Sequence, residues 1–270
     1  MTAKPRLDAE LVRRGLARSR QHACELVAAG RVRVAGLVAT KPATGVDLQV
    51  SLVVDDVDAE PPFASRGATK LLGALDAFPD VVVDGARALD AGASTGGFTD
   101  VLLRRGASSV VAVDVGYGQL AWRLRTDPRV TVVERTNVRT LTADAIGGPV
   151  QLVVADLSFI SLTLVLAPLA NVALAGADLL VLVKPQFEAG RDRVGSGGVV
   201  RDPEVRRETV LQVARAAVDA GLSVHGAHRS PLPGPAGNVE YFLWLRRGVP
   251  GLPPEDIETA VRRAVQENEQ

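Results

Sequence analysis

The stretch Leu89–Asp100, LDAGASTGGFTD, decides the fold of this 270-residue chain. It begins where an apolar run ends, and it carries three glycines, Gly92, Gly96 and Gly97, before a helical pattern starts at Phe98. A strand, a glycine-rich turn and a helix in this order present backbone N–H groups to a nucleotide-like ligand. The stretch therefore predicts an α/β domain that binds such a ligand.

Strand-like and helix-like patterns alternate from about Ser65 onward. The expected strands are Arg87–Asp90, Ser109–Val115, Val130–Glu134, Gln151–Asp156, Leu179–Lys184, Leu222–Ala227 and Val239–Leu245. The expected helices are Gly97–Arg105, Gln119–Thr126, Leu162–Leu174, Arg206–Ala220 and Glu255–Glu267. This order predicts a doubly wound, mainly parallel seven-stranded sheet of the Rossmann-like kind, with helices on both faces.

Residues 1–59 predict a second, smaller domain. One helical stripe ends at Gly15, a second can begin at a capping Ser19 and end at Gly30, and Arg31–Val34 then alternates like a strand. These short elements indicate a compact α+β module.

The charge of the chain is unevenly distributed, although its formal net charge is zero. Between residues 1 and 41, nine basic residues stand against three acidic ones, which gives this segment a net charge of +6. Such a charge fits contact with phosphates, but a solvated basic surface would give the same count. The acidic run 55–62 ends in two prolines and contains the first half of the expected linker, residues 60–65; residues 66–270 form the expected larger domain.

The glycine spacing at residues 92–97 departs from the dinucleotide pattern G-x-G-x-x-G. An acid, Asp90, precedes the first glycine, and Asp114 ends the next strand, where a carboxylate can bind ribose hydroxyls. This arrangement favours S-adenosylmethionine (SAM) over NAD; a turn that needs glycines only for packing is the remaining alternative. The expected cofactor residues are Asp90, Gly92, Ala93, Ser94, Thr95, Gly96, Gly97, Phe98, Asp114, Asn137 and Asp156.

The residue types present narrow the class of methyl transfer that a SAM-binding domain of this chain could catalyse. Methylation of a pyrimidine carbon-5 needs a catalytic cysteine, and the single cysteine, Cys24, lies outside the α/β domain. Methylation of an exocyclic amine often uses an acid or Asn followed by Pro-Pro-aromatic, whereas Asp156 is followed by Leu-Ser-Phe. Neither class is favoured. The single cysteine also fits a reducing compartment such as the cytoplasm.

Four polar residues stand at the ends of expected elements: Lys70, Asp156, Lys184 and Glu240. Because the carboxyl ends of parallel strands line the ligand crevice, we expect Asp156 and Lys184 to lie together beside Gly92. A lysine that is desolvated or close to a second lysine gives up its proton more readily, and the neutral amine can deprotonate a ribose hydroxyl. Singly, each residue is more often a surface charge, but the combination favours catalysis.

Several runs resemble the TlyA family of ribosomal RNA cytidine 2′-O-methyltransferases over nearly the whole chain. They are LDAELVRRGLARSR, SRGATKL, LDAGASTGGF, DVGYGQLAW, ERTNVR, VVADLSFISL, LVKPQFE and SPLPGPAGNVEYFLWL. The larger domain resembles the FtsJ-like ribose methyltransferases, whose catalytic Lys-Asp-Lys-Glu set falls on Lys70, Asp156, Lys184 and Glu240. The smaller domain resembles the αL-motif RNA-binding domain of a small-subunit ribosomal protein. Some members carry a Trp before Ser-Arg-Gly, where this chain has Glu-Pro-Pro-Phe, so no linker-specific role is implied.

The resemblance implies SAM-dependent methylation of a cytidine 2′-hydroxyl in the ribosomal RNA of one or both subunits. It implies a cytoplasmic protein, with a monomer favoured, that binds ribosomal subunits and not membranes. The expected RNA contacts are Arg6, Arg18, Arg20, Lys41 and Arg66. No metal is expected, because the three histidines, His22, His225 and His228, lack ligand spacing.

Three other functions are weighed against this interpretation. A membrane-active cytolysin would use residues 157–177, which hold no charge over the nominal length of a membrane helix, although their place between two strands favours a βαβ unit of a soluble domain. A non-catalytic RNA-binding protein would keep a degenerate methyltransferase fold, which the intact glycine loop argues against. An NAD-dependent oxidoreductase is disfavoured by the glycine spacing.

Overall fold

The computed structural model divides into two compact units, Met1–Pro62 and Phe63–Gln270. The residues that it describes are 4–28, 30–54 and 63–266. The acidic run 55–62, with the first residues of the expected linker, lies outside the described residues.

Phe63–Ser65, the other residues named for the linker, lie within the larger unit. The Ala64 N–H donates a hydrogen bond to the Asp100 carboxylate at 2.8 Å. The Arg104 guanidinium lies 4.2 Å from the centre of the Phe63 ring, within cation–π range. The chain is therefore anchored to the larger unit from Phe63 onward.

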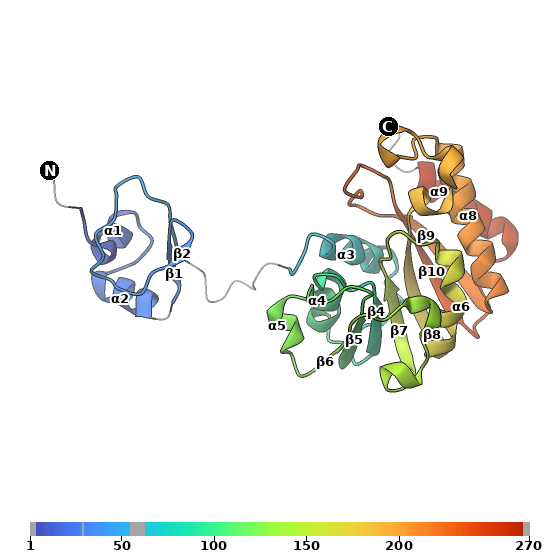
Figure 1. Ribbon diagram of the computed structural model, residues 1–270, viewed down its shortest axis with the longest axis horizontal. Coiled ribbons are helices and arrows are strands. Elements are labelled where there is room, and N and C mark those ends of the chain that lie inside the picture. Colours follow the sequence, from blue (N-terminus) through green and yellow to red (C-terminus); the bar gives the residue numbers. More distant parts are fainter. Residues whose placement is uncertain (1–3, 29, 55–62, 267–270) are drawn as a thin grey trace. The chain divides into compact units, whose positions relative to one another are not determined.

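Within its described residues, the smaller unit contains two helices and a three-stranded antiparallel sheet (Figure 1). Its elements are α1 (Leu7–Arg13), α2 (Arg20–Ala28), β1 (Val32–Val34), β2 (Leu37–Val38) and β3 (Leu52–Val54), with strand order β2-β1-β3. Leu7, Leu11 and Leu26 are buried in its core. The Ser19 hydroxyl accepts the His22 N–H at 3.1 Å and caps α2. The two predicted helices and the first strand are confirmed.

The larger unit is built on a seven-stranded sheet with the order β6-β5-β4-β7-β8-β10-β9. Its strands are β4 (Arg87–Ala91), β5 (Ser109–Val113), β6 (Val130–Val133), β7 (Val150–Ala155), β8 (Ala173–Val183), β9 (Leu222–Arg229) and β10 (Tyr241–Arg247). Strand β10 is antiparallel to both of its neighbours, and the pairings from β6 to β8 are parallel. The predicted mainly parallel, doubly wound sheet is confirmed.

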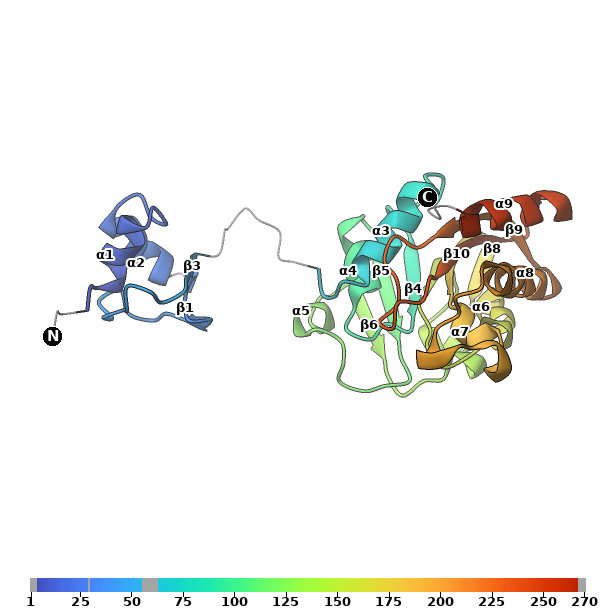
Figure 2. The same cartoon turned by 90° about the horizontal axis from the view of Figure 1, so that it is seen from above.

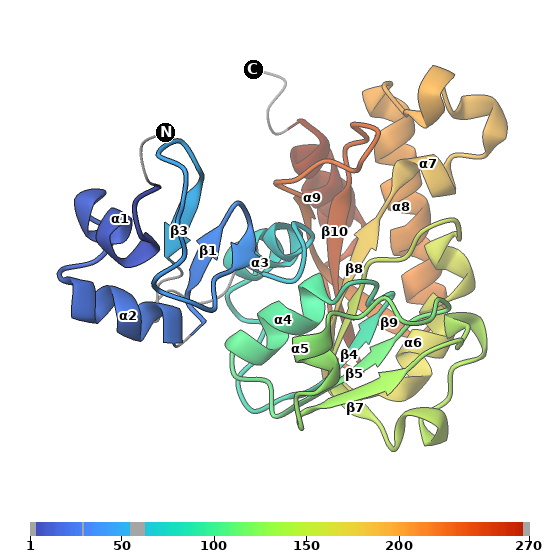
Figure 3. The same ribbon diagram turned by 60° about the vertical axis from the view of Figure 1, so that its left-hand side comes forward.

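Helices cover both faces of this sheet (Figures 2 and 3). They are α3 (Ala68–Ala77), α4 (Gly97–Arg104), α5 (Trp122–Arg125), α6 (Leu166–Val172), α7 (Pro185–Glu188), α8 (Pro203–Asp219) and α9 (Pro254–Gln266). Successive strand residues face opposite sides. Ala88 and Leu152 therefore join one core with α3 and α4, while Leu89 and Val153 join the other with α6, α8 and α9.

Several elements differ from the prediction. The expected helix Gln119–Thr126 is only α5, because Ala121 is extended and its N–H donates to the Thr95 carbonyl at 3.2 Å. The expected helix Leu162–Leu174 is broken into a 3₁₀ turn and α6, because Pro168 has no N–H with which to continue the ladder. Strand β8 begins at Ala173 rather than Leu179, and α3 was not predicted.

The uncharged segment 157–177 forms part of the core of the larger unit. It supplies a loop, the 3₁₀ turn Leu162–Leu164, α6 and the beginning of β8. Leu166 and Leu169 are buried beneath the sheet, whereas Leu164 is 53% exposed. No helix among the described residues is long and apolar enough to cross a membrane.

The carboxylate of Asp90 joins β4 to α4 inside the domain. It is fully buried, and its Oδ2 atom accepts both the N–H and the hydroxyl of Thr99, at 2.8 and 2.6 Å. Burial raises the pKa of Asp90 to about 7, although the hydrogen bonds from Thr99 act in the opposite direction. Asp90 is therefore an internal link between a strand and the following helix.

We expect Leu169→Ala to lower the free energy of unfolding by about 2–5 kcal/mol, because it leaves a cavity in the core. The matched control, Leu164→Ala, lies in the same uncharged segment but removes an exposed side chain, so its effect should stay within about 0.5 kcal/mol. Chemical denaturation measures both values. Equal effects of the two substitutions would contradict the buried position of this segment.

The stability contributed by Asp90 should depend on pH. Between its ordinary pKa of 3.8 and about 7, the folded protein holds a proton that the unfolded chain has lost, so stability falls as the pH rises through this range. Asp90→Asn removes the titration and keeps an acceptor for the Thr99 N–H. We expect the stability of the natural protein relative to Asp90→Asn to fall by up to about 4 kcal/mol across this range and then level off. A difference in the free energy of unfolding between the two proteins that stays constant at all pH values would contradict this assignment.

Candidate active site

The strand order brings the predicted catalytic side chains to one edge of the sheet. Asp156 directly follows β7, and Lys184 directly follows its parallel neighbour β8. Strand β10 runs in the opposite direction with Tyr241 opposite Val183, so Glu240, one residue before β10, lies beside Lys184. Lys70 lies on α3, which covers this part of the sheet. Four residues that are far apart in sequence therefore meet.

The four side chains form a chain of ion pairs centred on Asp156. Lys184 Nζ lies 2.6 Å from Asp156 Oδ1, and Lys70 Nζ lies 3.8 Å from Asp156 Oδ2. Lys70 Nζ also donates to Glu240 Oε2 at 2.6 Å. The two ammonium groups and two carboxylates balance in charge, which allows them to be held with little solvent contact.

The use of lysine at these two positions is informative. The chain has four lysines among 31 basic residues, and two of the four meet in this cluster, each with a side chain only 9% exposed. Arginine forms firmer ion pairs but does not release its proton in proteins, whereas lysine can. The pattern fits a site that needs a proton acceptor in addition to positive charge.

A cavity of about 450 Å³ opens beside Asp156 at the carboxyl ends of the parallel strands. Five of the predicted cofactor residues line it: Gly92, Ser94, Asp114, Asn137 and Asp156. The Asp114 carboxylate is fixed by two backbone donors, the Ser94 N–H at 2.8 Å and the Gly116 N–H at 2.6 Å. An ionised carboxylate held in this way can still accept hydrogen bonds from the hydroxyl groups of a ribose.

Gly92 allows the cavity wall and the catalytic loop to approach each other. Its φ angle is +88°, and a Cβ atom at this position would lie 2.6 Å from the Asp156 carbonyl oxygen. A larger residue would push the end of β7 away from the turn after β4. Glycine at this position is therefore needed both for the location of Asp156 and for the conformation of the turn.

The remaining predicted cofactor residues are not among those that line this cavity. Asp90 is buried against Thr99, Ala93 is in the core, and Phe98 stacks on Phe242 with a centre-to-centre distance of 6.1 Å. Thr95 accepts the Ala121 N–H. Added Cβ atoms at Gly96 and Gly97 would meet Leu124 and Ser65 at 2.3 Å, so these glycines permit close packing. Except for the exposed Thr95, these residues are buried in the contact between β4, the glycine turn and α4.

Sequence reasoning missed Ser158, whose hydroxyl accepts a hydrogen bond from Lys184 Nζ at 2.9 Å. It lies two residues after Asp156 and also lines the cavity. In the sequence, the run Leu-Ser-Phe argued only against methylation of an exocyclic amine. The signal that could have identified Ser158 was its position two residues after the catalytic candidate Asp156. Gln119 and Thr136, which also line the cavity, had no such signal.

A second cavity, of about 560 Å³, adjoins the first and shares Phe159 and Ile160 with it. Phe187 contributes to its wall, and its ring lies 5.2 Å from that of Phe159 and 5.9 Å from Lys184 Nζ. Phe159 is 91% exposed and has a positive φ of 62°, an uncommon conformation for a bulky residue. Lys184 is thus bonded to residues of the first cavity and lies near the aromatic wall of the second.

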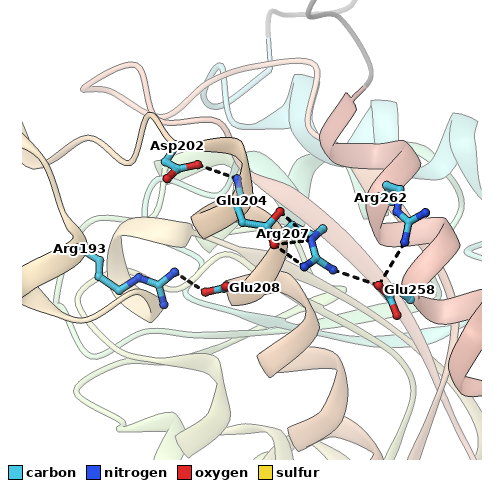
Figure 4. Close-up of polar contacts among 7 residues, drawn as sticks. All are labelled: Arg193, Asp202, Glu204, Arg207, Glu208, Glu258 and Arg262. Carbon is cyan, nitrogen blue, oxygen red and sulfur yellow. Dashed lines mark hydrogen bonds and ion pairs between the residues drawn. The ribbon is translucent and has the colours of Figure 1, made fainter.

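A wider depression of about 740 Å³ lies over α8 and α9, away from the strand ends. Figure 4 shows ion pairs that involve four of its charged residues, Arg193, Arg207, Glu208 and Glu258. Arg193 pairs with Glu208, and Arg207 bonds both Glu204 and Glu258, the latter at 3.1 Å. These contacts tie α8 to α9 and to the loop before α8. Because these pairs neutralise much of the charge of this depression, and because it lies away from the strand ends, we do not place the active site there.

The predicted RNA contacts fall in both units. Arg6, Arg18, Arg20 and Lys41 belong to the smaller unit, where Arg18, Arg20 and Lys41 are exposed and the Arg6 side chain is 52% exposed. Arg66 is exposed in the larger unit, four residues before Lys70. The structure brings Arg6 and Arg20 together on one carboxylate, that of Asp8.

Comparisons with known proteins agree with both units. Residues 63–247 match the FtsJ-like methyltransferase family, and residues 5–50 match the S4 domain. The 16S/23S rRNA (cytidine-2'-O)-methyltransferase TlyA of Mycobacterium tuberculosis is 60% identical over 268 residues, which cover 99% of each chain.

Two further relatives extend the comparison. Hemolysin A of Brachyspira hyodysenteriae is 36% identical over 88% of this chain and 98% of its own. A solved structure from Streptococcus thermophilus superimposes with a TM-score of 0.71 at 38% identity, covering 99% of this chain and 98% of that one. Since the similarity to TlyA extends over both units at high identity, this chain belongs to the TlyA family of FtsJ-like methyltransferases.

Proposed function

We propose that this protein transfers a methyl group from SAM to the ribose 2′-hydroxyl of a cytidine in ribosomal RNA. One observation carries the proposal: two buried lysines, Lys70 and Lys184, share the carboxylate of Asp156 at the edge of a cavity suited to a nucleoside. The printed name of the Mycobacterium tuberculosis relative supports the cytidine 2′-hydroxyl and the ribosomal RNA substrate. Ribosomal subunits are cytoplasmic, so the proposal includes that location.

The first cavity fits SAM in size and in chemistry. Its volume of about 450 Å³ lies within the usual range of small-molecule sites. Asp114 offers a fixed carboxylate for the ribose hydroxyls, and Val138 and Leu157 offer apolar walls for an adenine. When bound, SAM supplies an electrophilic methyl group on a positively charged sulfur.

Lys184 is the proposed general base. It contacts Asp156 and Ser158, which both line the first cavity, and it lies near Phe187 in the second. Asp156 and Ser158 hold its amine in place. Once the ammonium has released a proton to solvent, the neutral Nζ can accept the proton of a hydroxyl between the two cavities. Lys70, held at 2.6 Å by the buried Glu240, positions Asp156 from the other side.

The second cavity is the proposed site of the acceptor nucleotide. The ribose 2′-hydroxyl can reach Lys184 there only if the cytidine leaves its stack, as enzymes that act on stacked nucleotides require. The exposed ring of Phe159 and the neighbouring Phe187 can stack on the displaced base. The positive φ of Phe159 is a form of local strain that is typical of functional sites.

The S4 domain is proposed to bind folded ribosomal RNA through phosphates and shape. Arg6, Arg18, Arg20 and Lys41 supply the positive charge, and Arg66 is proposed to contact RNA from the larger unit. An A-form duplex exposes little readable sequence, so such contacts set position more than base identity. The polar cluster and the cavity argue against an inactive enzyme. The place of segment 157–177 in the fold of the larger unit, with Leu166 and Leu169 in its core, argues against a membrane-active cytolysin.

We expect Asp114→Asn to weaken SAM binding about 10- to 100-fold, because it removes a charged acceptor from the ribose hydroxyls. Isothermal titration calorimetry of the full-length protein measures this change. Asp80→Asn is the same substitution at an exposed site that does not line the cavity, and it should leave the affinity for SAM unchanged. If both variants bind SAM like the natural protein, Asp114 does not hold the cofactor.

Lys184→Arg and Lys184→Ala should both lower methyl transfer from labelled SAM to unmethylated ribosomal subunits by roughly 100-fold or more. Arginine keeps the positive charge but does not act as a base, so it should not rescue the reaction. Lys70→Arg is the matched substitution at the other lysine, and it should retain much more activity because that position needs only charge.

The affinity for SAM, measured in parallel, should be little changed in all three lysine variants. Substantial activity of Lys184→Arg would overturn the role of Lys184 as the base. Undiminished transfer by Lys184→Ala and by Lys70→Ala together would overturn the proposed mechanism.

A further inference from the structure

A single buried carboxylate in the smaller unit holds two exposed arginines. Asp8 lies in the first turn of α1, and its side chain is only 3% exposed. It accepts two hydrogen bonds from Arg6, from Nε at 3.1 Å and from Nη2 at 2.9 Å, and one from Arg20 Nη2 at 3.0 Å. The side chains of Arg6 and Arg20 are 52% and 60% exposed, so their guanidinium groups lie at the surface.

The position of Asp8 is itself fixed by the backbone. Its N–H donates to the Pro42 carbonyl at 3.0 Å, and its Oδ1 atom accepts the Ala9 N–H at 2.8 Å. The bond to Pro42 also brings the loop that carries Lys41 next to the start of α1. The Arg6 guanidinium holds the pKa of Asp8 well below its usual range, so the carboxylate is ionised at neutral pH.

The contacts with Asp8 leave the two arginines able to bind another anion. A guanidinium has five N–H donors; Asp8 takes two from Arg6 and one from Arg20. Both Nη2 atoms lie within 3.0 Å of the same carboxylate oxygen, so the two groups are held close together. Free arginine side chains lose substantial conformational entropy when they bind, and a preordered pair loses less.

We propose that Asp8 is a positioning residue that joins Arg6 and Arg20 into one binding site for a phosphate of the RNA backbone. The inference rests on the proposed function, in which this domain binds ribosomal RNA. The pair presents two guanidinium groups to a single anion, which matches the bidentate recognition of phosphate by arginine. An acidic residue thereby strengthens the binding of a polyanion.

The neighbouring acid, Glu10, shows a different use of the same kind of contact. Glu10 is also buried, and it pairs with Arg13 and Arg14. Arg14 is only 23% exposed and donates to the backbone carbonyls of Val50 and Leu48 at 2.7 Å. Its guanidinium therefore ties α1 to the segment before β3, whereas the pair on Asp8 lies at the surface.

The proposal predicts that Asp8→Asn changes the affinity for RNA in the direction opposite to that expected from net charge alone. Asp8→Asn adds one unit of positive net charge to the domain, which by itself should strengthen binding to RNA. If Asp8 positions the arginines, the same substitution should weaken binding because the pair is no longer held. Glu25→Gln makes the same charge change at an exposed site on α2 and is the matched control.

The test uses the full-length protein and purified, unmethylated ribosomal subunits as the RNA probe, at KCl concentrations from about 50 to about 200 mM. We expect Asp8→Asn to raise the dissociation constant about tenfold and to lower the slope of its salt dependence by about 1. Glu25→Gln should bind as tightly as the natural protein or more tightly. With labelled SAM, Asp8→Asn should raise KM for subunits and leave kcat unchanged.

A double variant tests whether Asp8 acts through the two arginines. In an Arg6→Ala/Arg20→Ala background, which should itself weaken binding, Asp8→Asn should have little further effect. A further tenfold loss of affinity in that background would overturn the proposal. The proposal would also be overturned if the Asp8→Asn variant bound the subunits as tightly as the Glu25→Gln variant. If the natural protein does not bind the subunits at all, the proposed function fails, and this inference fails with it.

Thermal unfolding shows whether Asp8→Asn is folded. Should it not fold, Arg20→Lys tests the same site without disturbing the buried acid, because lysine keeps the charge and lacks the planar fork. Arg13→Lys is its control, since the Arg13 side chain is as exposed as that of Arg20 but pairs with a different buried acid, Glu10. A loss that is no greater for Arg20→Lys than for Arg13→Lys would overturn the proposal.

Discussion

The carboxylate of Asp156 lies between two lysine ammonium groups, and the larger unit is arranged around that contact. Two cations close together repel each other when they are desolvated, so an acid between them is a condition for their meeting. Parallel β7 and β8 place Asp156 beside Lys184, and the reversed direction of β10 adds Glu240. Gly92 lets the turn after β4 approach the same point. The cofactor cavity and the proposed catalytic cluster therefore depend on one edge of the sheet.

Sequence alone could predict the parts of this arrangement that depend on local pattern. Apolar runs that end in an acid or a lysine identified the strand ends at Asp156 and Lys184, and the alternation of strands and helices predicted the sheet. The inward direction of Asp90 and Phe98 could not be predicted, because it depends on how α4 packs after the glycine turn. The contact of Ser158 with Lys184 likewise depends on a loop conformation that no periodicity encodes.

The proposed catalytic cluster and the smaller unit use carboxylates differently. In the cluster, the half-buried Asp156 and the buried Glu240 hold lysines, which can exchange protons, and the proposed role is chemical. In the smaller unit, Asp8 and Glu10 hold arginines, which stay charged, and the proposed roles are positioning and folding. Carboxylates thus serve both the RNA-binding and the catalytic parts of the proposed activity, with lysine partners where a proton acceptor is proposed and arginine partners where a fixed charge is proposed.

The position of the transferred methyl group tests the central claim most directly. Unmethylated ribosomal subunits are incubated with the protein and SAM, the ribosomal RNA is digested, and the modified nucleotide is identified by tandem mass spectrometry. A cluster of two lysines with a shared aspartate at the acceptor site predicts the added methyl on the ribose oxygen of a cytidine. A methyl group found on a base, with the ribose unmodified, would contradict the account.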